Sequence, residues 1–123
     1  MFSIKHIGSN FVFEVFSAPG VSQSVLVSDA NIVLNNYNQF SATLLNDTIR
    51  LYINGLNSSF ALFNGNINSN AKNLVYGENF EGNIDEIRLW NMGKDSLTVG
   101  RDFTRQLNGL SPNLKVYLRL NEN

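Results

Sequence analysis

The stretch TIRLYINGLNSSFALF, residues Thr48–Phe63, contains the clearest structural signal in the chain. Its first half alternates in character, which places every second residue on one face of a strand: Ile49, Leu51 and Ile53. Asn54-Gly55 follows, and this dipeptide is typical of a two-residue type I′ turn because both turn positions need positive φ. The pattern predicts a β-hairpin with its turn at Asn54 and Gly55.

The period of two recurs along the chain, with Gly and Asn turn signals between the runs. A second short turn is expected at Asn46-Asp47. The expected strands are Phe2–Ile7, Phe11–Ser17, Val21–Val27, Asn31–Leu34, Gln39–Leu45, Thr48–Ile53, Ser59–Phe63, Leu74–Tyr76, Asn83–Asn91 and Lys115–Leu120. Many short strands predict an all-β sandwich or barrel, here as a single domain over residues 1–123.

One short helix is expected near the C-terminus. Asp95 or Ser96 can cap its start, and apolar residues recur at helical spacing: Val99, Phe103 and Leu107. Gly109 stands where a C-terminal glycine belongs, and Pro112 blocks continuation. The sequence therefore predicts a helix over 96–107.

Composition excludes several classes of protein. Of 123 residues, 43% are hydrophobic and 15% charged, and the net charge of -1 fits a globular chain. The nine Lys and Arg residues are scattered, so we expect no nucleic-acid partner. The chain has no Cys, no signal-peptide core and no apolar run long enough to span a membrane. It contains 20 asparagines, a residue type that suits turns.

Two adjacent carboxylates lie in the segment FEGNIDEIRLWN, Phe80–Asn91. Neighbours on a strand point to opposite faces, so Asp85 and Glu86 are not expected to act together as a general acid and base. Glu86 and Arg88 share a face and are expected to form an ion pair.

Asp85 has two interpretations, and both stay open. Placed just after the Gly82-Asn83 turn, it is expected to accept backbone N–H groups and to hold the strand entry in place. The alternative is that Asp85 is a calcium ligand. No other cofactor is expected.

We expect no catalysis. His6, the only histidine, falls within the first expected strand and fits a packed or exposed strand residue. No Gly-x-Ser-x-Gly elbow, paired metal-binding histidines or phosphate-binding glycine motif is present.

Ligand binding is better supported than catalysis. Tyr37, in an Asn-rich turn, is the aromatic residue most expected to be exposed and to stack on a sugar, whereas Trp90 is expected to pack. The polar loop 64–73 offers Asn64, Asn66 and Asn68 as ligand-binding residues. The alternative is that this loop only connects two strands.

Several segments in order resemble one family. FSATLLNDTIRLYINGL (Phe40–Leu56) is similar to the strand and hairpin of laminin-G-like jelly-roll domains, and FEGNIDEIRLWN resembles their downstream strand. The short helix, Leu107-Asn108-Gly109 and the closing run YLRLNEN (Tyr117–Asn123) follow in the same order. These domains belong to the concanavalin A-like lectin/glucanase superfamily.

The resemblance implies a two-sheet antiparallel β-sandwich with jelly-roll topology and one short helix. It also implies an extracellular or surface-associated module that binds glycans or surface and matrix proteins, in some members with calcium. Positions that match the family motifs are structural by this resemblance: Asn54, Gly55, Gly82, Asp85, Glu86, Arg88 and Trp90.

We expect one departure from the family: no counterpart is found before Phe40 for the N-terminal strands that the family carries ahead of this region. The sheet is therefore expected to have open edges that another chain or segment completes, or the chain is the C-terminal part of a larger domain. A further alternative is a reduced domain in which Phe2–Ile7 replaces a lost strand. Two functions remain open at this point. The first is a non-catalytic recognition module for glycan or surface protein, and the second is a surface or virion assembly component that forms homo-oligomers.

Overall fold

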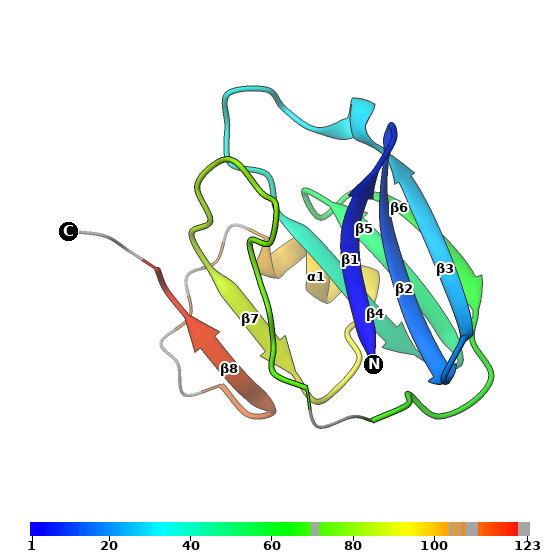
Figure 1. The fold of residues 1–123 in the computed structure, drawn as a ribbon. Helices are drawn as coiled ribbons and strands as arrows, with labels where there is room; N and C mark the ends of the chain where they lie inside the picture. Colours follow the sequence, from blue (N-terminus) through cyan, green and yellow to red (C-terminus); the bar gives the residue numbers. More distant parts are fainter. Residues whose placement is uncertain (70–71, 104, 106, 108–110, 121–123) are drawn as a thin grey trace. The chain divides into compact units, whose positions relative to one another are not determined.

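The computed structural model describes residues 1–69, 72–103, 105, 107 and 111–120. The chain is mostly β, with antiparallel sheets and one short helix near the C-terminus, which confirms the predicted fold class (Figure 1). Its elements are β1 Phe2–Ile7, β2 Asn10–Ala18, β3 Val21–Ser28, η1 Asp29–Asn31, β4 Phe40–Leu45, β5 Thr48–Ile53, β6 Asn57–Leu62, β7 Ile87–Trp90, α1 Ser96–Asp102 and β8 Leu114–Leu118.

The fold divides into two compact units. The first comprises Met1–Ser69 and Gly93–Gln106, and the second comprises Asn70–Met92 and Leu107–Asn123. The first unit contains β1 to β6 and α1, whereas the second contains β7 and β8.

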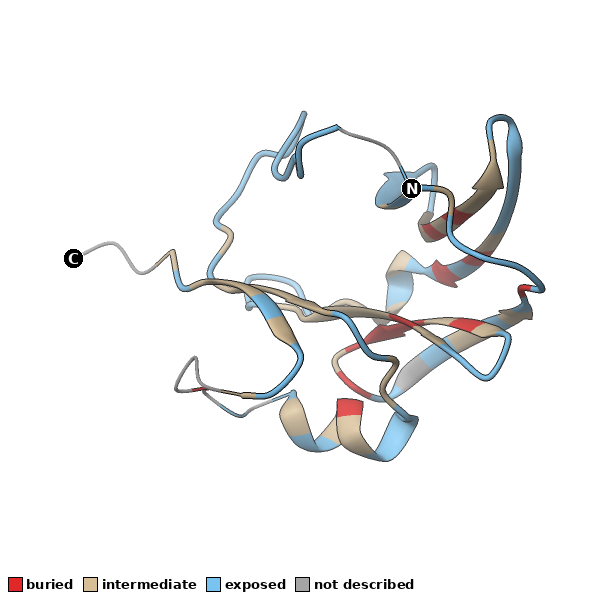
Figure 2. Cartoon of the chain, turned by 90° about the horizontal axis from the view of Figure 1, so that it is seen from below, coloured by how far each residue is buried: buried red, intermediate tan, exposed pale blue. Residues whose placement is uncertain are grey.

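Two three-stranded antiparallel sheets form the sandwich of the first unit, in the orders β1-β2-β3 and β4-β5-β6. Their facing sides supply one apolar core, whose buried members are Phe13, Val15, Val25, Val27, Ile49, Leu51, Ile53 and Phe63. Figure 2 marks these buried segments in red on both sheets. Each sheet is a meander of consecutive strands, so a jelly-roll order would need further strands beside them and stays a prediction.

The alternation that predicted β5 is confirmed, since Ile49, Leu51 and Ile53 are all fully buried. The predicted hairpin between β5 and β6 is also confirmed. Asn54 and Gly55 have φ of 55° and 72°, but Ile53 pairs with Asn57, so the loop has three residues instead of two.

The two-residue turn lies one hairpin earlier. Asn46 and Asp47 both have positive φ, 50° and 54°, between the paired residues Leu45 and Thr48. Asn and Asp tolerate this left-handed conformation better than other non-glycine residues. The Asn-rich sequence therefore supplies the tight turns of the β4–β6 meander.

Helix α1 begins where predicted and ends earlier. Asp95 is its N-cap and accepts a hydrogen bond of 2.8 Å from the backbone N–H of Thr98, which lowers the pKa of Asp95 below its usual value. The predicted end at Leu107 is wrong, because the helix stops at Asp102 and Arg105 N donates to Asp102 O in a tighter turn.

The predicted cap at Gly109 lies outside the described residues.

Two close backbone approaches involve the helix region and need glycine. A Cβ at Gly55 would lie 3.2 Å from the Cα of Gly100 in α1. A Cβ at Gly93, just before the helix, would overlap the carbonyl oxygen of Leu44 on β4.

Two predicted strands are absent from the described structure. In place of a strand at Asn31–Leu34, Ser28 caps the short helix η1 by accepting a hydrogen bond of 3.2 Å from Ala30 N. Leu74–Tyr76 has strand-forming residues, yet it adopts no regular structure and all three residues are exposed. Strand propensity alone does not form a strand without a hydrogen-bonding neighbour.

The second unit contains an antiparallel pair, β7 and β8, in which Ile87 pairs with Leu118. The predicted strand Asn83–Asn91 is too long at its start, so Asp85 and Glu86 precede β7 instead of lying within it. Strand geometry therefore does not set the directions of these two side chains, and the prediction that it places them on opposite faces does not hold.

Candidate functional site

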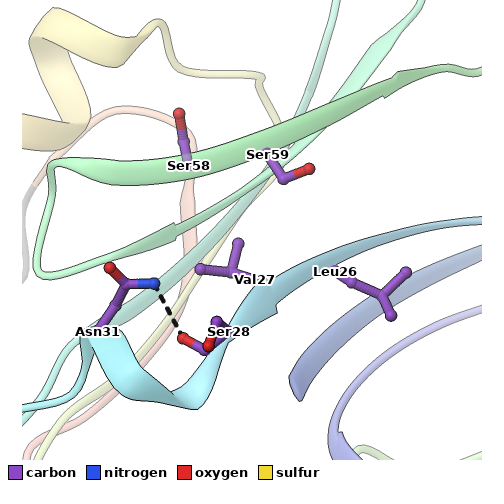
Figure 3. Close-up of a pocket in the computed structure, with 6 residues that line it drawn as sticks. All are labelled: Leu26, Val27, Ser28, Asn31, Ser58 and Ser59. Carbon is purple, nitrogen blue, oxygen red and sulfur yellow. Dashed lines mark hydrogen bonds between the residues drawn. The ribbon is translucent and has the colours of Figure 1, made fainter. Parts of the chain in front are cut away.

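An open cleft between β3 and β6 is the candidate site in the first unit. It has a volume of about 250 Å³ and is lined by Leu26, Val27 and Ser28 of β3, Asn31 of η1, and Ser58 and Ser59 of β6. Figure 3 shows these residues around the space between the two strands. No pattern in the sequence indicated this site, because its walls come from segments about 30 residues apart.

Hydrogen-bond registers explain why this cleft is polar. Asp29 N donates to Ser9 O, so with the β2–β3 register the backbone groups of Leu26 and Ser28 point away from β2. In the other sheet, Phe63 N donates to Asp47 O, and by the same alternation the backbone groups of Ser58 point away from β5. The cleft thus lies between two outer strand edges that expose N–H and C=O groups.

Side chains add hydroxyl and amide groups. Asn31 Nδ2 donates to the carbonyl oxygen of Ser28 at 3.0 Å, which orients the amide and directs its oxygen toward β6 (Figure 3). The side chain of Ser59 lies on the core-facing side of β6, because Ser59 pairs with the buried residue Leu51. The hydroxyl of Ser58 is turned away from Asn31, so Ser58 contributes mainly backbone (Figure 3).

The chemistry available in the cleft is that of binding. None of its six lining residues has an ionisable side chain, so they offer no general base and no activated nucleophile. They offer neutral donors and acceptors, which suit a ligand with several hydroxyl groups.

The four residues predicted to bind ligand lie elsewhere and do not come together. Tyr37 is exposed as predicted, with 69% of its surface accessible, in the loop before β4. Asn64 and Asn66 are exposed after β6, whereas Asn68 is half-buried and its N–H donates to Phe16 O at 2.7 Å.

Strand pairing separates these two groups. Tyr37 precedes the start of β4, which pairs with the end of β5, while the loop after β6 lies beside the start of β5, at Thr48. They therefore lie at opposite ends of the β4–β6 sheet, the length of a six-residue strand apart. The part of the predicted loop at 70–71 lies outside the described residues.

Next to Tyr37, asparagines serve structure. Asn54 Nδ2 donates to Asn38 Oδ1 at 2.9 Å, and the Nδ2 of Asn38 donates to Val33 O at 2.9 Å and to Asn36 O at 2.9 Å. These bonds fold the loop that presents Tyr37. The high asparagine content was the only sequence signal of this network.

Glu86 forms the predicted ion pair with Arg88, whose Nε donates to Glu86 Oε2 at 3.0 Å. Tyr117 of β8 donates to the other carboxylate oxygen at 3.0 Å, and its hydroxyl also lies 3.2 Å from Leu107 O. Because both carboxylate oxygens are engaged, Glu86 joins the two strands of the second unit. Trp90, which lies on β7 with Arg88, is half-buried.

Asp85 is exposed and participates in a polar or electrostatic interaction within the structure. Among the described residues, no group of three or more His, Cys, Asp or Glu side chains converges on one point. The structural and calcium-binding interpretations of Asp85 both stay predictions. Gly82, three residues earlier, has φ of 151°, a conformation that favours glycine.

His6 and Glu14 have structural partners on the β1–β3 sheet. His6 Nε2 lies 3.1 Å from Asp29 Oδ2, which links β1 to η1, and its ring stacks on Phe11. Ser22 donates to Glu14 at 2.8 Å, and this bond, with a smaller contribution from Lys5, lowers the pKa of Glu14 below its ordinary value against the opposing effect of burial.

No family model, curated protein or solved structure matches the chain in comparisons with known proteins. The laminin-G-like resemblance therefore stays a prediction. Among the described residues, no helix has the length and apolar character needed to cross a bilayer.

Proposed function

We propose that the protein is a non-catalytic recognition module that binds a glycan in the cleft between β3 and β6. The observation that carries the proposal is the composition of this cleft: two outward-facing strand edges, the amide of Asn31 and the hydroxyl of Ser59, with no ionisable side chain among the lining residues. Sugar hydroxyls donate and accept hydrogen bonds at once, so they match such a surface.

The dimensions favour a short ligand. At about 250 Å³ the cleft is smaller than pockets for drug-sized molecules, which begin near roughly 300 Å³. It fits a terminal sugar unit that stays partly in solvent. No aromatic side chain lines the cleft, so we expect weak binding, with a dissociation constant on the order of 1 mM.

The laminin-G-like resemblance of the sequence supports the same class of function. Domains of that type act in recognition and adhesion at cell surfaces or outside cells. We extend this location to the present chain as part of the proposal.

A glycan array followed by a titration monitored by amide chemical shifts tests the proposal. A glycan that the protein binds on the array should change the amide chemical shifts of Leu26, Ser28 and Ser58 in the titration. The double variant Ser59→Ala, Asn31→Ala should weaken binding at least about fivefold. The matched control is Asn66→Ala, which changes an exposed asparagine outside the cleft and should leave the affinity unchanged.

Three outcomes contradict the proposal. Shifts confined to Tyr37 or to residues 64–68 would move the site to the residues predicted from the sequence. A binding signal abolished by EDTA and restored by calcium would instead favour the calcium-dependent alternative. An array with no bound glycan, with and without calcium, would favour a different function.

The second candidate is an assembly component. A specific observation favours it: the core-side residues Phe2 and Ile4 of β1 are 44% and 43% exposed, at the free edge of the first sheet. Exposed apolar strand edges promote association between chains. Sedimentation of the purified chain should then show an oligomer, whereas a monomer at all concentrations would count against assembly.

A further inference from the structure

The backbone of β1 presents an unpaired edge on one side. Within the described sheets, β1 pairs with β2 alone. Met1 O accepts a hydrogen bond of 3.0 Å from Phe16 N, so in this register Ser3, Lys5 and Ile7 direct their backbone groups to β2. The N–H and C=O groups of the alternate residues therefore point outward: Phe2, Ile4 and His6.

The same edge carries apolar side chains on the core side. Phe2 pairs with Val15 and Ile4 pairs with Phe13, and both of these partners on β2 are buried in the core. Phe2 and Ile4 nevertheless keep 44% and 43% of their surface exposed. The apolar face of the sheet thus extends to its edge, where the opposite sheet covers it only in part.

Two common protections of an edge strand, a bulge and a proline, are absent from β1, and a third, a lysine, is engaged on β2. Edge strands are commonly protected by a bulge, a proline or a lysine that projects over the edge. The register of β1 with β2 is uninterrupted, and β1 has no proline. Its lysine, Lys5, is held by Glu14 on β2 at 3.2 Å and therefore leans away from the edge.

We propose that two copies of the chain associate through antiparallel pairing of their β1 edges, with Ile4 opposite the partner's Ile4. The two three-stranded sheets would then form one continuous six-stranded sheet across a two-fold axis. This inference rests on the assembly alternative and gives it a defined surface. It is independent of the glycan proposal.

Backbone alternation selects this register. Outward-pointing residues must pair with one another, and the two-fold registers that pair at least two of them on each chain are centred on Ser3, Ile4 or Lys5. The register centred on Lys5 sets two lysines directly opposite, which is destabilising. The register centred on Ser3 leaves His6 unpaired, whereas the register centred on Ile4 pairs every outward residue, including Phe2 with the partner's His6.

Charge also fits the register centred on Ile4. Lys5 lies opposite the partner's Ser3, and Ser3 is itself paired with Glu14 on the next strand. Lys5, the partner's Ser3 and the partner's Glu14 therefore lie in one line across the three neighbouring strands. Lys5 and that glutamate are two strand spacings, or about 10 Å, apart. The lysine of each copy thus faces toward the glutamate of the other copy across the joined sheet. Like charges in these positions would disfavour the dimer.

Sedimentation velocity over a range of concentrations tests the association, with circular dichroism as the check on folding. We expect a monomer–dimer equilibrium. Ile4→Lys should raise its dissociation constant at least about tenfold, because two lysines would meet at the two-fold axis. Leu62→Lys makes the same chemical change at an exposed residue of β6 and should leave the equilibrium unchanged.

Cross-linking tests the register. The chain has no cysteine, so a disulfide in Ile4→Cys must join two copies. Directly opposed residues of a hydrogen-bonded pair have Cα atoms about 5.5 Å apart, which is within disulfide range. We expect rapid cross-linking of Ile4→Cys under mild oxidation and little of Lys5→Cys, which lies opposite the partner's Ser3.

The outcomes separate this inference from the assembly function. A monomer at every concentration overturns both. A dimer that is insensitive to Ile4→Lys and does not cross-link through Ile4→Cys keeps the assembly function and overturns the β1 interface. Preferential cross-linking of Lys5→Cys overturns the register.

Discussion

Asn54 and Asn38 are joined by a side-chain hydrogen bond of 2.9 Å, and together they tie the turn after β5 to the loop before β4. Asn54 Oδ1 also accepts from Gln39 N at 2.9 Å, while Asn38 Oδ1 also accepts from Val33 N at 2.7 Å. Each amide therefore satisfies backbone groups that no strand pairing supplies. The two residues are 16 positions apart and hold one end of the β4–β6 sheet.

Substitutions at Asn54 should separate its two roles, hydrogen bonding and positive φ. Asn54→Gly keeps the φ of 55° accessible and loses the side-chain bonds, which should cost about 1–2 kcal/mol of unfolding free energy. Asn54→Ala also incurs the left-handed backbone penalty and should cost about 1 kcal/mol more. Urea denaturation measures both, and equal stability of the two variants would contradict the assignment.

Two glycines near α1 should respond in opposite directions to alanine. Gly93→Ala should destabilise the protein by about 3 kcal/mol, because the new Cβ would overlap Leu44 O and come within 2.9 Å of Leu45 Cβ. Gly100→Ala should be neutral or stabilising by up to about 1 kcal/mol, because its nearest neighbour, Gly55 O, is at 3.5 Å. Thermal unfolding of both variants gives the comparison, and a stable Gly93→Ala would show that β4 does not approach Gly93 closely.

Glu14 should contribute a pH-dependent part of stability. Its pKa is lower in the folded state than its ordinary value, so its contribution is fully present above the ordinary glutamate pKa and is lost as the pH falls through the folded pKa. Glu14→Gln should therefore be less stable than the parent at neutral pH, and the difference should narrow in acid. Ser22→Ala should reproduce much of the effect, since the Ser22 hydrogen bond is its main cause. A difference that grows in acid would reverse the assigned sign.

Asp85→Ala should lower the melting temperature to the same extent with calcium and with EDTA, if Asp85 fastens the entry to β7. The expected cost of losing hydrogen bonds to a charged acceptor is about 1 kcal/mol for an exposed residue. A loss of stability that appears only in calcium would instead assign Asp85 as a calcium ligand. Glu78→Ala removes an exposed carboxylate in the same unit as Asp85, at a residue without positive φ, and controls for general effects of charge.

Local patterns predicted much of the first unit. Strands β1 and β5 match their predicted bounds, and the turns at Asn46-Asp47 and Asn54-Gly55 lie where the sequence indicated them. These features depend on neighbours in sequence: alternation sets the buried face, and Asn or Gly permits positive φ. The N-cap at Asp95 belongs to the same local class.

Features that depend on distant partners were missed. Leu74–Tyr76 has the residues of a strand without a paired strand, and the helix was predicted to continue to Leu107 because its apolar spacing gives no information on where packing ends. The cleft is the clearest case. The cleft is polar because the backbone N–H and C=O groups of Leu26 and Ser58 point away from the neighbouring strands. Their direction depends on the pairing register of β3 in one sheet and of β6 in the other.

The chain contains a single tryptophan, Trp90, and it lies on β7 in the second unit. Tryptophan fluorescence therefore reports on the surroundings of a residue in the second unit, while six of the eight strands that contribute to the far-ultraviolet dichroism of the described chain belong to the first unit. Followed together during denaturation, the two signals report whether both units unfold in one cooperative step or in two. The placement of one indole ring thus gives the protein a built-in probe of coupling between its parts.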